Sequence, residues 1–340
     1  MINKNKPINY GLQILRMFSS FWVVINHCYD SFQHKRLHYY LYQKPFHVPN
    51  FMFLSFYFYY KHLKERQINK IIQRFQRLLI PYIIWPFIYL ITNNICLKFF
   101  GWSNYGRYLS FKDYFIQIII GSRYLSIFWY LTVLLFLSIF FTIVAFLIPN
   151  YFLFIIKIVG FLFYGIHRSS IYDYLIKNKL FYISLVLTIR FAPISVIGLT
   201  FSSLNIIKNI ENHFIRNIII NVCFLYFLFR YNIFNFNDIF IYQDVDTITI
   251  GSINFFCIFS LLPLKYIENE KIILILKYFT NYTGGIYYIH ILTRNFLKRI
   301  SIHVKQDTFF GVIIIYINTY FISFFGNKIF KKTIIKHLFN

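Results

Sequence analysis

The sequence predicts an all-α fold, a polytopic transmembrane bundle of about ten helices. Of its 340 residues, 58% are hydrophobic and only 14% are charged, whereas soluble domains carry about a quarter charged residues. Such a chain cannot cover a soluble surface with polar groups, but lipid tails solvate apolar side chains. Backbone groups in lipid need internal partners, so helices are the expected spanning form. The chain also lacks the alternating ten-residue pattern of a membrane barrel.

Apolar stretches with few charges recur along the whole chain, and most approach the roughly 20 residues that a spanning helix needs. They cover approximately residues 10–28, 50–60, 78–99, 127–148, 151–166, 180–203, 216–234, 247–264, 278–296 and 308–327. Ten such helices use about 200 residues and leave short loops. We therefore expect a single integral membrane domain over residues 1–340, without a separate soluble catalytic domain.

The formal net charge of +24 bears on the partner. A soluble protein this basic often binds nucleic acid. Here the Lys and Arg residues are scattered between apolar runs, so loop cations facing anionic lipid headgroups explain them better. The lipid bilayer is the expected partner, and nucleic acid is not. The four cysteines form no CxxC pair and lie in or beside apolar runs, which favours small buried hydrophobes over a disulfide framework or a zinc site.

Basic residues also predict the orientation, because short cytoplasmic loops are enriched in Lys and Arg. Two basic clusters fall on one side if the number of helices is even, which places both termini and the second loop in the cytoplasm. The plasma membrane is the expected location, with a secretory organelle as the alternative. The clusters are Lys61, Lys64, Arg66, Lys70, Arg74 and Arg77, and in the C-terminal tail Lys328, Lys331, Lys332 and Lys336.

The first apolar segment contains two ionisable residues, Arg16 and His27. Eleven residues of helix place them within about 20° on one face and about 16 Å apart along the axis. Charged groups at membrane depth usually face the bundle interior. The alternatives are that Arg16 snorkels to the headgroups and that His27 is an ordinary interfacial histidine. Asp30 is a candidate to accept a hydrogen bond from the imidazole and fix its tautomer.

A second group of candidates follows in the later segments. Arg74 and Arg77 are neighbours on one helix face, and two guanidinium forks side by side suit bidentate binding of phosphate. The alternative is an ordinary basic stop before a membrane helix. Trp129 and His290 are further polar groups at membrane depth, although a lone histidine in a helix is more often structural.

Five blocks of the sequence, taken in order, resemble the membrane-bound acyltransferase family three. The family signature in the first helix is an arginine, ten residues and a histidine, which Arg16 and His27 reproduce. One residue departs from the family pattern, because Phe56 follows Ser55 where the family has glycine. The blocks are Leu15–Arg16 with Val23–His27, His47–Phe56, Arg74–Pro81, Phe128–Leu131 and Gly285–His290.

The resemblance implies transfer of an acyl group, usually acetyl, from acyl-coenzyme A to a hydroxyl of a cell-surface glycan or a small exported molecule. It implies that His27 and Arg16 are the catalytic pair and that Arg74 and Arg77 meet the phosphates of the coenzyme. Acetyl-CoA is then the acyl donor, and no metal is expected. The Phe56 departure and the divergent middle helices leave a non-catalytic family member as an alternative.

The residues fit this chemistry. Ester formation needs a base for a weakly acidic hydroxyl, and a neutral imidazole with a pKa of about 6.5 is suited to that role at physiological pH. His27 is therefore the expected general base, or an acyl carrier as the alternative. Arg16 is expected to hold a donor oxygen or stabilise the tetrahedral intermediate, while Trp129, His290 and Asp30 are expected at the acceptor cavity. A transporter or flippase of a lipid-linked sugar is the main rival, although no internal repeat is visible.

Overall fold

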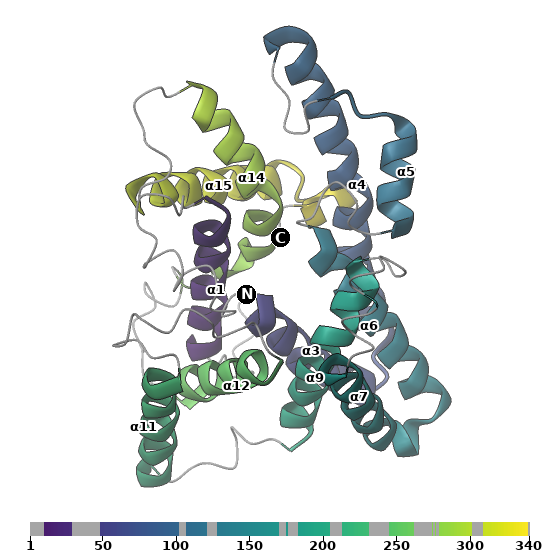
Figure 1. Ribbon diagram of the computed structural model, residues 1–340, viewed down its shortest axis with the longest axis vertical. Coiled ribbons are helices and arrows are strands. Elements are labelled where there is room, and N and C mark those ends of the chain that lie inside the picture. Colours follow the sequence, from purple (N-terminus) through teal and green to yellow (C-terminus); the bar gives the residue numbers. More distant parts are fainter. Residues whose placement is uncertain are drawn as a thin grey trace.

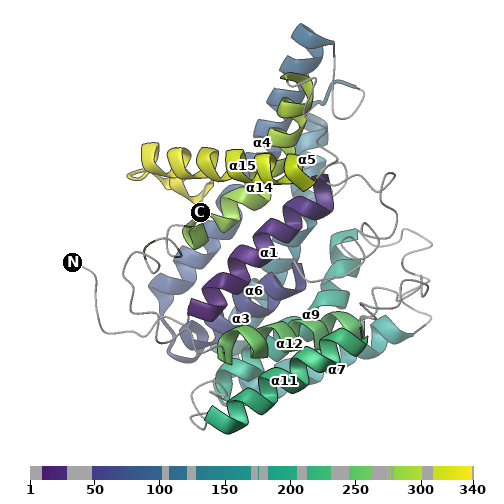
Figure 2. The same ribbon diagram turned by 90° about the vertical axis from the view of Figure 1, so that its left-hand side faces the viewer.

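A computed structural model shows that the chain is all-α, which confirms the expected fold class. Figure 1 shows the helices as one bundle, and Figure 2 shows the same bundle from the side of α1 (Tyr10–Cys28). The structure describes residues 10–28, 48–101, 107–120, 128–169, 175, 183–204, 213–230, 245–261, 274, 276, 279–300 and 309–338. The helices that follow α1 are α3 (Val48–Lys64), α4 (Ile68–Phe100), α5 (Phe111–Ile120), α6 (Trp129–Leu147), η2 (Pro149–Tyr151), α7 (Phe152–Arg168), α9 (Ile183–Ser203), α11 (His213–Arg230), α12 (Val245–Leu261), α14 (Thr283–Ile300), α15 (Phe309–Ile329) and η4 (Ile334–Leu338).

Length and composition indicate which helices can cross a membrane. Within the described ranges, five helices are long and apolar enough to span a bilayer, and two shorter apolar helices accompany them. The chain is therefore a multi-pass membrane protein. The five spans are Ile68–Phe100, Trp129–Leu147, Pro149–Arg168, Val186–Ser203 and Phe310–Ile329, and the shorter helices are Tyr10–Ile25 and Gly251–Leu261.

The basic segment between the second and third apolar stretches is a tight turn flanked by helices, whereas the sequence suggested a loop. Arg66 adopts a left-handed conformation with φ 47°. The Gln67 N–H donates to the carbonyl of His62 at 2.9 Å, and the Arg66 N–H donates to that of Leu63 at 3.1 Å. α4 begins directly afterwards at Ile68. Arg74 and Arg77 therefore lie on the same rigid helix as the apolar segment that follows them.

The helix α4 is the longest element, with 33 residues and a length of about 50 Å, which exceeds the roughly 30 Å hydrocarbon core of a bilayer. Near its C-terminal end, Asn94 donates to the Leu109 carbonyl at 2.7 Å and accepts from the Leu109 N–H at 2.9 Å. These bonds fix Leu109 against the end of α4, just before α5 begins at Phe111. The sequence did not predict this ten-residue helix. Arg107 and Ser110 hydrogen-bond to Asp113 at the start of α5 and hold the pKa of its carboxyl well below its usual range.

The helix α3 is the centre of the bundle, because it packs along α9 and also contacts α1, α4, α6 and α12. The α3–α9 contact is close enough that a Cβ on Gly198 would lie 2.5 Å from the carbonyl oxygen of Phe53. Phe53 is almost fully buried and packs on Phe256 of α12 with ring centroids 4.6 Å apart. A glycine on α9 thus allows two backbones to meet, and aromatic rings fill the space around that contact.

The glycine at the α3–α9 contact can be tested against a matched glycine elsewhere. We predict that Gly198→Ala destabilises the protein by about 1–3 kcal/mol, because the added methyl group displaces backbone atoms of α3. Gly165→Ala is the control, since a Cβ there meets no atom within 4 Å and alanine is the better helix former by about 1 kcal/mol. Thermal unfolding in detergent measures both variants. Equal melting temperatures for the two variants would contradict the close α3–α9 contact.

Candidate functional site

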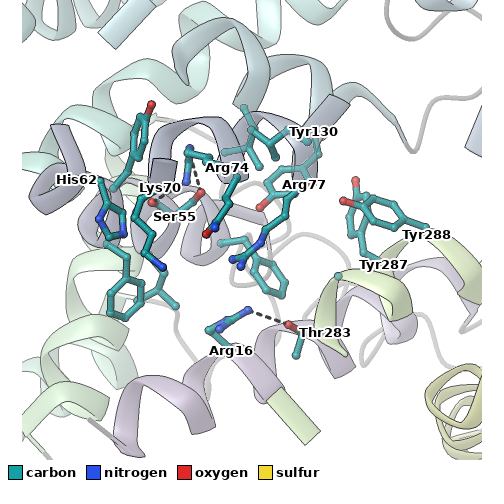
Figure 3. Close-up of a pocket in the computed structure, with 18 residues that line it drawn as sticks. Arg16, Ser55, His62, Lys70, Arg74, Arg77, Tyr130, Thr283, Tyr287 and Tyr288 are labelled. Atoms are coloured by element: carbon teal, nitrogen blue, oxygen red, sulfur yellow. Dashed lines mark hydrogen bonds between the residues drawn. The ribbon is translucent and has the colours of Figure 1, made fainter. Parts of the chain in front are cut away.

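The helices α1, α3, α4, α6 and α14 converge around a cavity of about 540 Å³ (Figure 3). This volume is within the range of small-molecule and cofactor sites. The lining is aromatic and basic, and it contains no Asp or Glu among the residues described there. The lining residues are Arg16, Phe51, Leu54, Ser55, Phe58, Tyr59, His62, Lys70, Gln73, Arg74, Arg77, Leu78, Tyr130, Leu134, Thr283, Gly284, Tyr287 and Tyr288.

Four permanent cations, Arg16, Lys70, Arg74 and Arg77, face this one space. Like charges gathered around one cavity repel one another, and the partly buried Arg16 and Arg74 are the least screened by solvent. A cleft lined by one sign of charge also concentrates ligands of the opposite sign. The cavity is therefore suited to a ligand with several negative charges.

Arg74 is the most firmly held of these cations. Its Nε donates to Ser138 Oγ at 3.1 Å, its Nη1 to the Ser55 carbonyl at 3.2 Å and its Nη2 to Ser55 Oγ at 2.9 Å. Its Cζ also lies 4.1 Å from the ring centre of Tyr59 and 5.0 Å from that of Phe56. Three of the five guanidinium N–H groups are committed to the protein, so two remain for a ligand.

Phe56, the residue that departs from the family pattern, is fully buried beneath Arg74. Its ring meets Phe141 of α6 edge-on, with centroids 5.1 Å apart. Phe56 is not among the residues that line the cavity. The bulky ring therefore fills the contact between α3 and α6 and supports the guanidinium, and it leaves the described cavity open.

Arg77 lies one turn further along α4 and is exposed to the cavity (Figure 3). Among the residues that the structure describes, its guanidinium has no hydrogen-bond partner, in contrast to that of Arg74. The two arginines thus differ in their environment although they are neighbours in sequence. Arg74 is part of the protein framework, and all five N–H groups of Arg77 are available to a ligand.

Arg16 and His27 lie on the inward face of α1. Arg16 donates to Thr283 Oγ1 of α14 at 3.3 Å. Between the two residues, Ser20 is buried with its hydroxyl 3.0 Å from the hydroxyl of Tyr316, and Val23 is fully buried. This face therefore looks into the bundle and not into lipid.

His27 lies beside His290 of α14, with ring centroids 5.1 Å apart. Neither histidine is among the cavity lining residues, so the structure separates them from the arginines. Tyr287 joins the two regions, because it lines the cavity and its ring centroid is 6.3 Å from that of His290. The arginine cavity and the histidine pair are thus two neighbouring regions with Tyr287 between them.

Trp129 and Asp30 are the two remaining candidates from the sequence. Trp129 stacks on Phe191 of α9 with centroids 5.1 Å apart, and it is outside the cavity lining. Asp30 lies outside the residues that the structure describes. Several residues of the site were not singled out from the sequence, namely Tyr130, Ser138, Thr283 and Tyr287, and Lys70 was noted only as a member of a basic cluster. They come from different helices, and only the packing of those helices brings them together.

A protein-family model described as an acyltransferase domain matches residues 9–327. The chain belongs to the membrane-bound acyltransferase family three. The match extends from α1 to α15 and includes every helix that lines the cavity. No curated protein and no solved structure matches the chain. Membership makes the chain a multi-pass membrane acyltransferase of this family.

The unequal environments of the two arginines lead to a stability prediction. We expect Arg74→Met to lower the free energy of unfolding by about 2 kcal/mol or more, because it leaves the Ser55 and Ser138 groups without their donor. Arg77→Met, one turn away and exposed, is the matched control and should change stability by less than about 0.5 kcal/mol. Thermal unfolding in detergent compares the two variants. The framework role of Arg74 would be wrong if both variants unfold at the wild-type temperature.

Proposed function

We propose that this acyltransferase takes an acyl group, acetyl in the first instance, from acyl-coenzyme A and transfers it to a hydroxyl of a glycan or another exported molecule. The observation that supports the donor is the set of cations in the cavity, Arg16, Lys70, Arg74 and Arg77, which face no carboxylate among the described lining residues. Coenzyme A carries a pyrophosphate and a further phosphate, and guanidinium forks bind such groups bidentately.

The separation of the two regions fits the shape of this donor. Arg16 and His27 are eleven residues apart on α1, which is about 16 Å along the helix axis. The phosphates of the donor bind at the arginines, and the long, thin pantetheine arm extends past Tyr130 and Tyr287 towards His27. Arg16 lies in the cavity with Arg74 and Arg77. It therefore binds a phosphate or pantetheine oxygen of the donor and does not stabilise the tetrahedral intermediate.

His27 acts as the general base in the proposed reaction. A ring nitrogen of His27 takes the proton of the acceptor hydroxyl while the hydroxyl oxygen attacks the thioester carbonyl carbon. The tetrahedral intermediate collapses, the carbon–sulfur bond breaks, and the leaving thiolate receives that proton from the imidazolium. The products are an ester and the free thiol of coenzyme A, and no metal takes part.

The acceptor side and the orientation belong to the same proposal. Trp129, held flat against Phe191, offers an aromatic face to a glycan, and Asp30 is a further polar group for this side. The cavity opens to the cytoplasm, where acyl-CoA is made, and the basic residues Lys61, Lys64 and Lys70 follow the positive-inside rule. Both termini are then cytoplasmic, and the protein resides in the plasma membrane.

The base is tested by His27→Ala. We predict that this variant inserts and binds acetyl-CoA but loses transfer by a factor of about 10²–10⁴, the usual contribution of a general base. The measurement is release of free coenzyme A thiol in proteoliposomes, together with mass analysis of O-acetyl groups on surface glycans. Wild-type transfer by a well-expressed His27→Ala variant would remove His27 from the mechanism. Absence of any acetyl transfer by the wild-type protein, with glycan flux instead, would favour the transporter alternative.

The donor site is tested by Arg77→Ala. Loss of a charge-assisted, bidentate contact should weaken acetyl-CoA binding by about 10–100-fold, because such bonds contribute about 1.5–3 kcal/mol. Lys157→Ala is the matched control, since Lys157 is an exposed cation of α7 outside the cavity. Calorimetric titration with acetyl-CoA compares the two variants. If Arg77→Ala binds acetyl-CoA as tightly as the wild type, Arg77 serves only as a basic stop before a membrane helix and does not bind the donor.

A further inference from the structure

His290 has a defined tautomer in this structure. Its side chain is fully buried, and its Nδ1 lies 3.1 Å from the carbonyl oxygen of Ile286, one turn back on α14. A carbonyl oxygen can only accept a hydrogen bond, so Nδ1 carries the hydrogen of the neutral ring. The other ring nitrogen, Nε2, is then an acceptor with a free lone pair.

This acceptor is buried without a donor. No hydrogen-bond partner of His290 Nε2 exists in the part of the chain that the structure describes. Buried polar atoms are nearly always paired, and an exception calls for an explanation. An aromatic or aliphatic side chain would pack at this position without a lone pair to satisfy. The imidazole of His290 is thus more than a space-filling group.

The neighbour that can supply the missing donor is His27. The two ring centroids are 5.1 Å apart, within the range of rings in contact. Catalytic hydrogen bonds are often long before substrate binds and shorten in the complex. Among the described groups, Arg294 lies one turn beyond His290, and its positive charge interacts with the imidazoles of both His27 and His290. Arginine has no acceptor atom, so it cannot replace His290 in this role.

We infer that His290 is a positioning residue whose Nε2 accepts the ring N–H of His27 and thereby fixes the His27 tautomer. The opposite nitrogen of His27 is then the one that takes the proton of the acceptor hydroxyl. The shared hydrogen stays on His27 throughout, and only the hydroxyl proton moves on to the thiolate. This inference rests on the proposed function, and it gives His290 a role within the base and not in the wall of the acceptor cavity.

Three variants test the role of His290. His290→Phe keeps a ring of similar size but removes the acceptor, and His290→Gln restores an acceptor near the Nε2 position. Asp30→Asn tests the rival acceptor considered from the sequence. The assay is coenzyme A thiol release from acetyl-CoA in proteoliposomes, with kcat and KM determined separately. Acetyl-CoA affinity is measured in parallel, because His290 does not line the arginine cavity and unchanged donor binding reports intact folding.

We expect His290→Phe to lower kcat at least tenfold with an unchanged KM for acetyl-CoA, and His290→Gln to recover most of that loss. A wild-type kcat in His290→Phe would overturn the inference, and so would equal losses in the Phe and Gln variants. A large loss in Asp30→Asn with none in His290→Phe would assign the acceptor to Asp30. Full activity in His27→Ala would instead refute the proposed function, whatever the His290 variants do.

Discussion

The site depends on the hydrogen bonds that fix the guanidinium of Arg74. Its guanidinium joins α3, through Ser55, to α6, through Ser138, while its own backbone belongs to α4. Arg74 therefore connects three helices at one point. The Arg77 side chain, on the next turn of α4, faces the same space as Arg16 and Lys70. The Arg74 bonds therefore hold together three of the helices that line the cavity.

The cations of the cavity differ in the number of protein groups that contact them, and the cost of burying a charge explains this difference. A guanidinium inside a membrane protein needs partners, and Arg74 has hydroxyls, a carbonyl and two aromatic faces. Arg16 has the hydroxyl of Thr283. Arg77 is exposed to the cavity, and within the described residues no carboxylate compensates it. Arg74 and Arg16 thus have hydrogen-bond partners within the protein, and the guanidinium of Arg77 is left to bind an external anion.

The sequence predicted the helical membrane fold because composition and apolar run length depend only on local residues. It also predicted that Arg16 and His27 share a face, since helical geometry alone determines this. It did not predict that Thr283, Tyr130 and Ser138 complete the site, because these contacts link helices far apart in the chain. The consequence of Phe56 was also beyond sequence reasoning. From the sequence, Phe56 was only a departure from the family glycine, whereas the structure shows its ring buried against Phe141 between α3 and α6.

The close contact of α3 and α9 at Gly198 ties one wall of the cavity to the rest of the bundle. A third helix, α7, joins this contact through Gly160, where an added Cβ would lie 3.0 Å from Val196 of α9. Close packing at these two glycines joins α3, α7 and α9 into one block. Of these three helices, α3 lines the cavity. The opposite wall is built from α1 and α14, which meet at the Arg16–Thr283 bond and at the two histidines. Because α1 carries Arg16 at the cavity and His27 at the histidine pair, a donor that displaces one end of this helix would also displace the imidazole at the other.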